Sequence, residues 1–494
     1  MQNETNEMNR NYLKILEMKL ITNMSSSISK GITAFLWLMF LCNVSYLVLQ
    51  TLNPIEWYYG NLVRINGFTI LIWTLVTFFS ALISHYSINY LKGFEYGAKF
   101  SWLCFGFTLS IMAFVMCNHV VLLILAWLLM GVFMSQIIGV NSKWGEAKEA
   151  SKYALRYFIS GSVFLTIGSL LLAFQTGSFT LSEIISETDN LPQSIALISA
   201  LCIIMAAIIQ SAIYPFHRWL LSAMTAPTPA SALMHAGFVN GSGILLALFS
   251  SVLFKSNTLI ILFVIGGLTA IIAQFTKLIQ VNVKQKLACS TIAQMGFMIM
   301  QCGLGLFNAA IVHLILHGFY KAYLFLSAGE EVQYTAPQKP LNITIKPLQA
   351  IVVVFFGIFG ALTFNMLTGK GMVLNSSIFL TLIVAITVGQ VTYNIVKERS
   401  FTPLQKTYLP PVLFISGIVA YALIYNSISS LISGMPMIAV PLGLSATEIG
   451  FGIIFLLGFF VMKLGIYRKY PGLYVKLLNI SQPYKKTVLM YKSK

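Results

Sequence analysis

Histidine and lysine recur at regular spacing inside one apolar stretch of the chain. His313, His317 and Lys321 stand four residues apart, so a helix over 306–329 would hold them along one face. Imidazole both accepts and donates protons near neutral pH, which suits a proton relay. Two histidines four residues apart also occur at metal sites, but neither a third ligand nor a glutamate is near them in sequence. The spacing therefore favours a relay and predicts neither a metal ion nor another cofactor.

A second group of polar residues surrounds three prolines. His217 and His235 lie in this stretch, which reads QSAIYPFHRWLLSAMTAPTPASALMHAGFVNGSG from residue 210 to 243. Proline lacks a backbone donor and interrupts a helix. An interrupted helix at membrane depth is tolerated only where it is buried in protein or lines a wet cavity. A packed, hydrogen-bonded side chain is the alternative for each histidine, but their position favours an ion pathway. The residues expected to break the helix are Gln210, Pro215, Pro227 and Pro229.

Two more lysines stand beside apolar stretches. Lys284 precedes the stretch 286–305, where it belongs either to the same pathway or to the membrane edge as an anchor. Gly369 and Gly371 flank Lys370 after the stretch 346–368, which predicts a local opening of the helix around that lysine. An ordinary loop lysine is the alternative reading of Lys370.

The composition around these residues is that of a polytopic membrane protein. Of the 494 residues, 57% are hydrophobic and 9% are charged, whereas an average soluble protein has roughly 25% charged residues. The 31 Lys and Arg exceed the 14 Asp and Glu, which gives a net charge of +17. A nucleic-acid-binding protein would gather its bases on a soluble domain, and no stretch of this chain is predicted to form one. The basic excess instead fits cytoplasmic loops at a lipid bilayer.

Apolar stretches of about 20 residues predict an all-α fold with about fourteen transmembrane helices. Five of these stretches are 228–254, 286–305, 346–368, 377–397 and 445–466. Lys and Arg concentrate in every second connection, which predicts a multi-pass protein of the cell membrane with both termini in the cytoplasm. Spans three to seven and eight to twelve form two sets of five, and an odd number inverts the second set relative to the first. The expected segments are a cytoplasmic N-terminal segment (1–31), peripheral helices (32–99), a first five-helix repeat (100–254), a second (255–400), C-terminal helices (401–466) and a basic cytoplasmic tail (467–494).

The two predicted helix breaks take equivalent places in these repeats. Gln210–Pro215 ends the fourth span of the first repeat, and Gly369–Gly371 ends the fourth span of the second. Paired interruptions of this kind mark the ion pathway in transporters built from inverted repeats.

The motifs PFHRWL…APTPASALMHAG and NVKQKLACSTIAQMGFM…HLILHGFYKAYLFLSAG resemble those of a known family. It is the antiporter-like subunit family of respiratory NADH dehydrogenases and multisubunit cation/proton antiporters. The resemblance implies a pathway for H+ or Na+ through two inverted half-channels that a central row of Lys and His joins. Carried over by motif, that row is His235, Lys284, His313, His317 and Lys321, with His217 near the first half-channel and Lys370 as the broken-helix lysine on the exit side.

Within this family, ALMHAGFVNGSG resembles the DabB-type subunits of inorganic carbon transporters. That resemblance implies a large soluble, zinc-containing DabA-like partner at the cytoplasmic face, which hydrates CO2 to bicarbonate while this subunit supplies the ion flux. The alternatives are a subunit of a monovalent cation/proton antiporter or of an NADH-quinone oxidoreductase-like complex, and a membrane anchor that conducts nothing. An enzyme acting alone is disfavoured, because the chain lacks a dinucleotide-binding glycine motif and an Fe–S cysteine spacing.

Two departures from the family pattern bear on the first half-channel. The family pairs a tryptophan with a glutamate where this chain has Trp127 and Leu128, and it has a lysine where this chain has Gln210. Losing both charges together is physically coherent, since either charge alone in lipid would cost several kcal/mol. We therefore expect a modified first half-channel.

Overall fold

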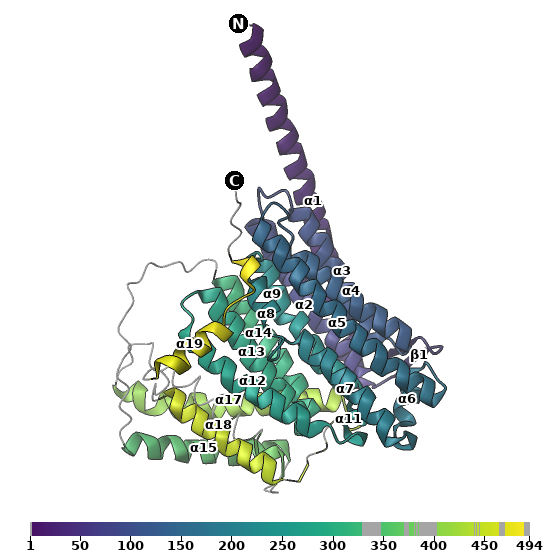
Figure 1. The fold of residues 1–494 in the computed structure, drawn as a ribbon, viewed down its shortest axis with the longest axis vertical. Helices are drawn as coiled ribbons and strands as arrows, with labels where there is room; N and C mark the ends of the chain where they lie inside the picture. The colour runs from purple at the N-terminus through teal and green to yellow at the C-terminus, as the bar shows by residue number, and fades with distance from the viewer. Residues whose placement is uncertain are drawn as a thin grey trace.

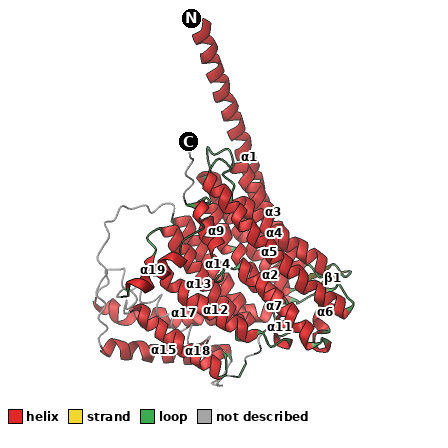
Figure 2. Ribbon diagram, viewed as in Figure 1, coloured by secondary structure: helices red, strands yellow, loops and turns green. Residues whose placement is uncertain are grey.

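The computed structural model describes residues 2–328, 347–369, 375–379, 381, 384, 403–438, 440, 442–443, 445–463 and 470–488. Figure 2 shows that the described chain is almost entirely helical. The first half contains α1 (Gln2–Leu52), α2 (Gly67–Tyr90), α3 (Gly97–Met116), α4 (Val120–Ile138), α5 (Gly145–Thr176), α6 (Leu181–Ser186), α7 (Gln193–Gln210), α8 (Arg218–Ser222), α9 (Thr228–Ala236), α10 (Gly241–Leu248) and α11 (Ser250–Lys255). The second contains α12 (Leu259–Ile279), α13 (Val283–Gly303), α14 (Phe307–Ser327), α15 (Pro347–Thr368), α17 (Pro403–Leu431), α18 (Ala446–Lys463) and α19 (Pro471–Ile480). Short 3-10 turns are η1 (Thr188–Asn190), η2 (Ala223–Thr225), η3 (Phe238–Asn240) and η5 (Lys485–Thr487).

Ten helical segments in the described residues are long and apolar enough to cross a bilayer. An all-helical, multi-pass membrane protein is thereby confirmed. Helices α13, α15 and α18 lie at three further positions predicted as spans. The span predicted at 377–397 falls largely outside the described residues. The count of fourteen and the division into inverted repeats stay predictions.

Glycines bring the central helices α12 and α13 into close contact. A Cβ atom added to Gly266 would lie 2.5 Å from the carbonyl oxygen of Gly296, and one added to Gly296 would lie 2.7 Å from the carbonyl oxygen of Gly266. Small residues allow helix backbones to approach this closely, and packing of this kind holds helices together in a bilayer, where lipid is as apolar as the side chains.

A two-stranded hairpin interrupts the helical pattern between α1 and α2. Strand β1 (Trp57–Tyr59) pairs antiparallel with β2 (Val63–Ile65), with Trp57 opposite Ile65. Gly60 occupies the turn with a φ of 51°, a left-handed conformation that favours glycine. The sequence analysis predicted helices alone and missed this element, because a hairpin of six paired residues has too short a periodic pattern to detect.

The segment predicted as one span over 228–254 is divided. It consists of α9, the turn η3, α10 and α11, which follow one another closely along the chain. Its residues are almost all buried. Figure 1 shows α9 surrounded by other helices of the bundle. Such an irregular segment is compatible with membrane depth because protein surrounds it.

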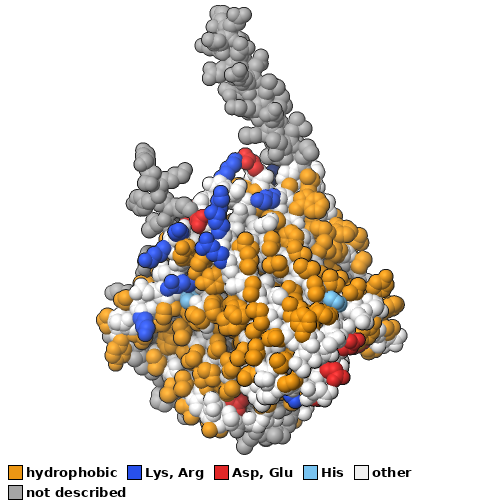
Figure 3. Space-filling model, turned by 45° about the vertical axis from the view of Figure 1, so that its right-hand side comes forward, with side chains coloured by type: hydrophobic (Ala, Val, Ile, Leu, Met, Phe, Trp, Pro, Cys, Tyr) orange, Lys and Arg blue, Asp and Glu red, His pale blue; other side chains and the backbone are white. Residues whose placement is uncertain are grey.

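Charged side chains separate toward two ends of the bundle. Figure 3 shows most of the blue bases toward the end from which α1 projects, and most of the red acids away from it. We call the first the basic end, defined by the exposed bases Lys143, Lys148, Lys152, Arg156, Arg218, Lys476, Lys485 and Lys486. We call the second the acidic end, defined by the exposed acids Glu56, Glu183, Glu187 and Asp189. Helix α5 runs between them, from Gly145 at the basic end to Thr176 at the acidic end.

Candidate ion pathway

The first helix break begins where α7 stops at Gln210. The chain then turns through Ala212, whose φ of 55° is unusual for a residue with a side chain. It resumes as the short helix α8, and α9 begins only at Thr228 with Pro227 as its N-cap and Pro229 inside its first turn. Pro215 lies in the irregular connection between α7 and α8.

Buried hydrogen bonds satisfy the backbone groups that this break exposes. The Trp219 indole donates over 2.9 Å to the carbonyl of Ile209 in the last turn of α7, which also accepts from the Ala212 backbone. The amide of Gln210 donates to the carbonyl of Phe238 over 3.3 Å. The Ser211 hydroxyl donates to the carbonyl of Val239 over 2.8 Å. The break is therefore held against η3 rather than left open to lipid.

Gln210 makes a neutral contact where the family pattern has a lysine. Its side chain is 2% exposed and packs near the sulfur of Met130 on α4. Trp127 of α4 is also buried, with its ring 5.1 Å from that of Phe114. An uncharged amide at Gln210 needs no acidic partner on α4, which agrees with the joint loss of both charges.

His217 lies at the basic end, between the break and the C-terminal helix α19. Its Nε2 atom is 2.8 Å from the carbonyl oxygen of Ile480, and its ring centroid is 3.9 Å from that of Tyr214. It is 4% exposed. Burial, together with the nearby Arg218 charge, lowers the pKa of His217 to about 4. The neutral imidazole is thus the resident form at physiological pH.

Helix α14 carries His313, His317 and Lys321 in one line. The ring centroids of His313 and His317 are 6.2 Å apart, and Lys321 is fully buried. The Lys321 ammonium donates to the carbonyl of Leu287 on α13 over 3.0 Å. Both ring nitrogens of His317 are buried without a hydrogen-bond partner in the described residues. Such nitrogens are available to mobile water or a passing proton.

Helix α9 brings His235 to the same line. His235 is fully buried, its ring stacks on Phe325 of α14 at 4.4 Å between centroids, and its charge would interact with that of Lys321. Gly318 makes this contact possible, because a Cβ there would lie 3.1 Å from the carbonyl oxygen of Ala236. The structure therefore brings together His235, His313, His317 and Lys321.

Two lysines lie beside this row toward the basic end. Lys284, at the start of α13, donates to the carbonyl of Ala226 just before α9, over 2.8 Å. Lys277, in the last turn of α12, is close enough to Lys321 for their charges to interact. The sequence analysis missed Lys277, because only the packing of α12 on α13 brings it to the row.

The second helix break lies only partly within the described residues. Helix α15 ends at Thr368, and Gly369 follows it with a φ of 66°. Lys370 and Gly371 lie outside the described residues.

Acidic side chains do not join the row in the part of the chain that the structure describes. Glu448, the buried acid of α18, accepts hydrogen bonds from the backbone and hydroxyl of Ser445 and caps its own helix. The same residues contain no group of three His, Cys, Asp or Glu placed to hold a metal ion. The arrangement suits transfer of protons between the His and Lys side chains, with water molecules carrying the proton where two side chains are not in contact.

Comparison with known proteins identifies the family. Residues 117–396, more than half of the chain, match the family described as NADH:quinone oxidoreductase/Mrp antiporter, TM. The chain belongs to this family. The matched range begins before α4 and includes α7, the break and α14, so every described residue of the row falls inside it.

Relatives within the family include two proteins named probable inorganic carbon transporter subunit DabB. The one from Bacillus anthracis is 36% identical over 305 residues, which cover 60% of this chain and 59% of that protein. The one from Bacillus subtilis is 38% identical over 265 residues, which cover 52% of each. The NADH-ubiquinone oxidoreductase chain 5 of Podospora anserina is 31% identical over 266 residues, covering 53% of this chain and 40% of the relative. The chain thus spans roughly half of the length of the curated relatives it matches.

Solved structures share the fold. A chain of the Mrp complex from Dietzia sp. DQ12-45-1b superposes with a TM-score of 0.56 at 19% identity, covering 95% of this chain and 52% of that one. A chain of the membrane-bound sulfane sulfur reductase, an archaeal respiratory membrane complex, has a TM-score of 0.56 at 18% identity and covers 94% and 95%. At this identity the likeness concerns the fold alone.

Proposed function

We propose that this protein is the ion-translocating membrane subunit of an energy-coupled system that accumulates inorganic carbon. It moves H+ or Na+ across the cell membrane and works with a large soluble, zinc-containing DabA-like subunit at the cytoplasmic face, which hydrates CO2 to bicarbonate. The DabB names of the relatives at 36% and 38% identity support this role.

One observation carries the ion-translocating part of the proposal. Lys321 is fully buried beside His235 and His317, whose ring nitrogens are buried and have no hydrogen-bond partner among the described residues. A buried base without an acidic partner is costly in a membrane, and residues of this kind mark ion pathways. The pathway runs from His217 at the basic end through this row, and Lys370 takes the exit side.

The basic end faces the cytoplasm in this proposal, because cytoplasmic loops collect Lys and Arg. Both termini then lie in the cytoplasm. The soluble partner meets the protein at the same end, where exposed bases of α5 and the C-terminal segment gather.

Co-expression in a host that lacks carbonic anhydrase tests the proposal. We expect growth at ambient CO2 when this chain is produced together with a DabA-type partner, and none with either protein alone. Failure of the pair to support growth, with both proteins in the membrane fraction, would overturn the inorganic carbon role.

The respiratory relative and the Mrp-like fold favour a second candidate, a subunit of a cation/proton antiporter or of an NADH-quinone oxidoreductase-like complex. Membrane vesicles separate the two candidates. The antiporter role predicts Na+/H+ exchange that does not depend on CO2 or on the soluble partner, whereas the carbon role predicts an ion flux that the partner and CO2 increase.

A further inference from the structure

A small pocket at the acidic end lies outside the proposed ion pathway. It lies between the hairpin, the ends of α2, α3 and α6, and the connection after α17, and it has about 430 Å³ of empty space including its mouth. Its polar lining comes from Arg64, Asn66, Thr69, Asn118 and Ser182, with Cys117, Leu248 and Met435 among the other lining residues.

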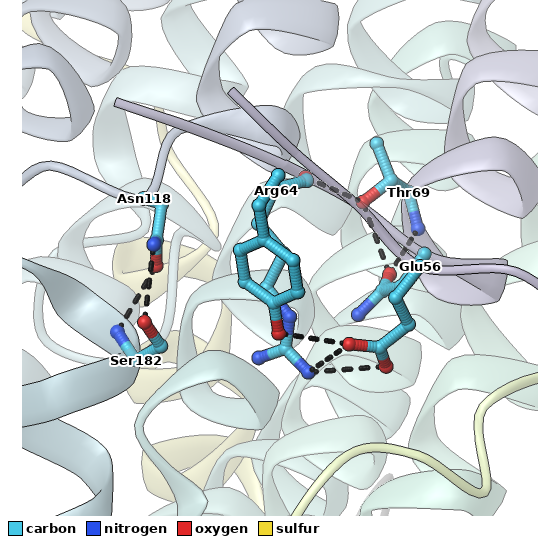
Figure 4. Close-up of polar contacts among 7 residues, drawn as sticks. Glu56, Arg64, Thr69, Asn118 and Ser182 are labelled. Carbon is cyan, nitrogen blue, oxygen red and sulfur yellow. Dashed lines mark hydrogen bonds and ion pairs between the residues drawn. The ribbon is translucent and has the colours of Figure 1, made fainter. Parts of the chain in front are cut away.

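Arg64 is the charged residue of this pocket, and one of its donors is free. The terminal Nη2 atom of Arg64 is 3.2 Å from both carboxylate oxygens of Glu56 (Figure 4). The Nε atom is buried and has no hydrogen-bond partner among the described residues. Burying a guanidinium N–H without an acceptor costs free energy, and none of the described residues supplies an acceptor for this atom.

The neighbouring side chains of Asn118 and Ser182 also have hydrogen-bond donors that are not used in their mutual contact. The Asn118 amide donates to the Ser182 hydroxyl over 3.0 Å and accepts from the Ser182 backbone over 3.0 Å (Figure 4). The Ser182 oxygen is an acceptor in this pair, so its O–H remains available to donate, as does the second N–H of Asn118. Asn118 is 3% exposed, which makes it a fixed, buried part of the lining.

The described lining of the pocket contains no acidic residue. The free groups of Arg64, Asn118 and Ser182 described above are all hydrogen-bond donors. Glu56 lies on the outer side of Arg64 and also accepts from the Tyr58 hydroxyl over 2.9 Å. Burial raises the pKa of Tyr58, and the hydrogen bond to Glu56 raises it further, so the phenol remains a donor. Glu56 already occupies the Nη2 atom of Arg64 and would compete with an incoming anion for it.

We propose that this pocket binds a small trigonal oxyanion such as bicarbonate, with Arg64, Asn118 and Ser182 as its donors. Arg64, Asn118 and Ser182 line the same pocket, and a guanidinium beside neutral donors matches the in-plane oxygens of such an ion. The assignment of bicarbonate as the natural ligand rests on the proposed function, whereas the binding of an oxyanion does not. The pocket then offers an inorganic carbon species a site at the face opposite to the basic end.

Thermal unfolding of the purified full chain in lipid nanodiscs tests the proposal without any transport assay. Sodium bicarbonate, sodium nitrate and sodium chloride are compared at equal ionic strength and pH 8. We expect bicarbonate and nitrate to raise Tm in a saturable manner and chloride to raise it much less. Equal effects of all three salts, or no effect of any, would refute the site.

Matched variants distinguish binding from a structural role of the ion pair. Arg64→Gln should weaken oxyanion binding by about tenfold or more, because it removes a charged donor. Glu56→Gln should instead strengthen binding, because it removes the competing carboxylate. Lys255→Gln, a change of another base near the acidic end whose ammonium contacts the Asp189 carbonyl, should leave binding unchanged. If Arg64→Gln and Glu56→Gln lower Tm equally and neither alters the effect of bicarbonate, the pair is structural only and the proposal fails.

Discussion

Lys321 keeps its ammonium group fully buried with a backbone carbonyl as its hydrogen-bond acceptor. Replacing a buried, unpaired charge by an apolar side chain of similar volume is often neutral or stabilising. We therefore expect Lys321→Met to keep or raise Tm. Proton flux into proteoliposomes, followed with a pH-sensitive dye, should nevertheless fall by about tenfold or more, since a base that exchanges the proton is lost.

Lys286→Met is the matched control for this prediction. Lys286 lies in the first turn of α13 and is exposed. Its replacement should leave flux near that of the unchanged protein. Equal flux in both variants would show that the buried ammonium takes no part in conduction.

The spacing of single residues predicted the row on α14 well. His313, His317 and Lys321 recur every four residues, and the helix period places such residues in line. The contact of His235 with Phe325 and the approach of Lys277 to Lys321 were beyond prediction. Both depend on tertiary packing, of α9 on α14 and of α12 on α13, and a local pattern holds no information on that packing.

Helix α19 folds back over the break at the basic end. The Ile480 carbonyl accepts a hydrogen bond from His217, the Tyr484 ring stacks on Tyr153 at 4.3 Å, and the Tyr484 backbone donates to the Ser222 hydroxyl over 2.9 Å. The sequence analysis predicted a basic tail here but no docking. The reason is that these contacts join residues separated by more than 260 positions.

The docking of α19 should depend on pH through His217. Its pKa is lowered to about 4 in the folded protein, whereas a released imidazole has a pKa of about 6.5. Folding therefore favours the neutral form, so this contribution to docking is complete above about pH 6.5 and is lost as the pH falls toward 4. Hydrogen exchange of residues 471–488, corrected for the intrinsic effect of pH, should become faster over this range.

His217→Gln provides the control for α19. Glutamine stays neutral and its amide can still donate to the Ile480 carbonyl, so the exchange rate of α19 should no longer change between pH 6.5 and 4. A pH dependence that persists unchanged in this variant would assign the effect to another group.

At the scale of the whole molecule, the separation of charge was predictable, because Lys and Arg concentrate in every second connection between the predicted spans. Figure 3 shows most of the bases toward one end of the bundle and most of the acids toward the other. The pocket around Arg64 was not predictable. It needs the hairpin to meet the ends of α2 and α6, and the sequence analysis assigned no structure to the hairpin.

The orientation of the whole molecule gives the last prediction. Single cysteines introduced as Lys485→Cys and Glu187→Cys report on opposite ends, in a background that lacks Cys42 and Cys202, the natural cysteines that are not buried. Cytoplasmic loops collect bases because bases are retained on that side during insertion. A membrane-impermeant maleimide should therefore label Glu187→Cys in intact cells and Lys485→Cys only in inverted vesicles. The reverse pattern would mean the opposite orientation in the membrane, with the Arg64 pocket at the cytoplasmic face. An oxyanion site there would receive the product of the soluble partner rather than an external ion.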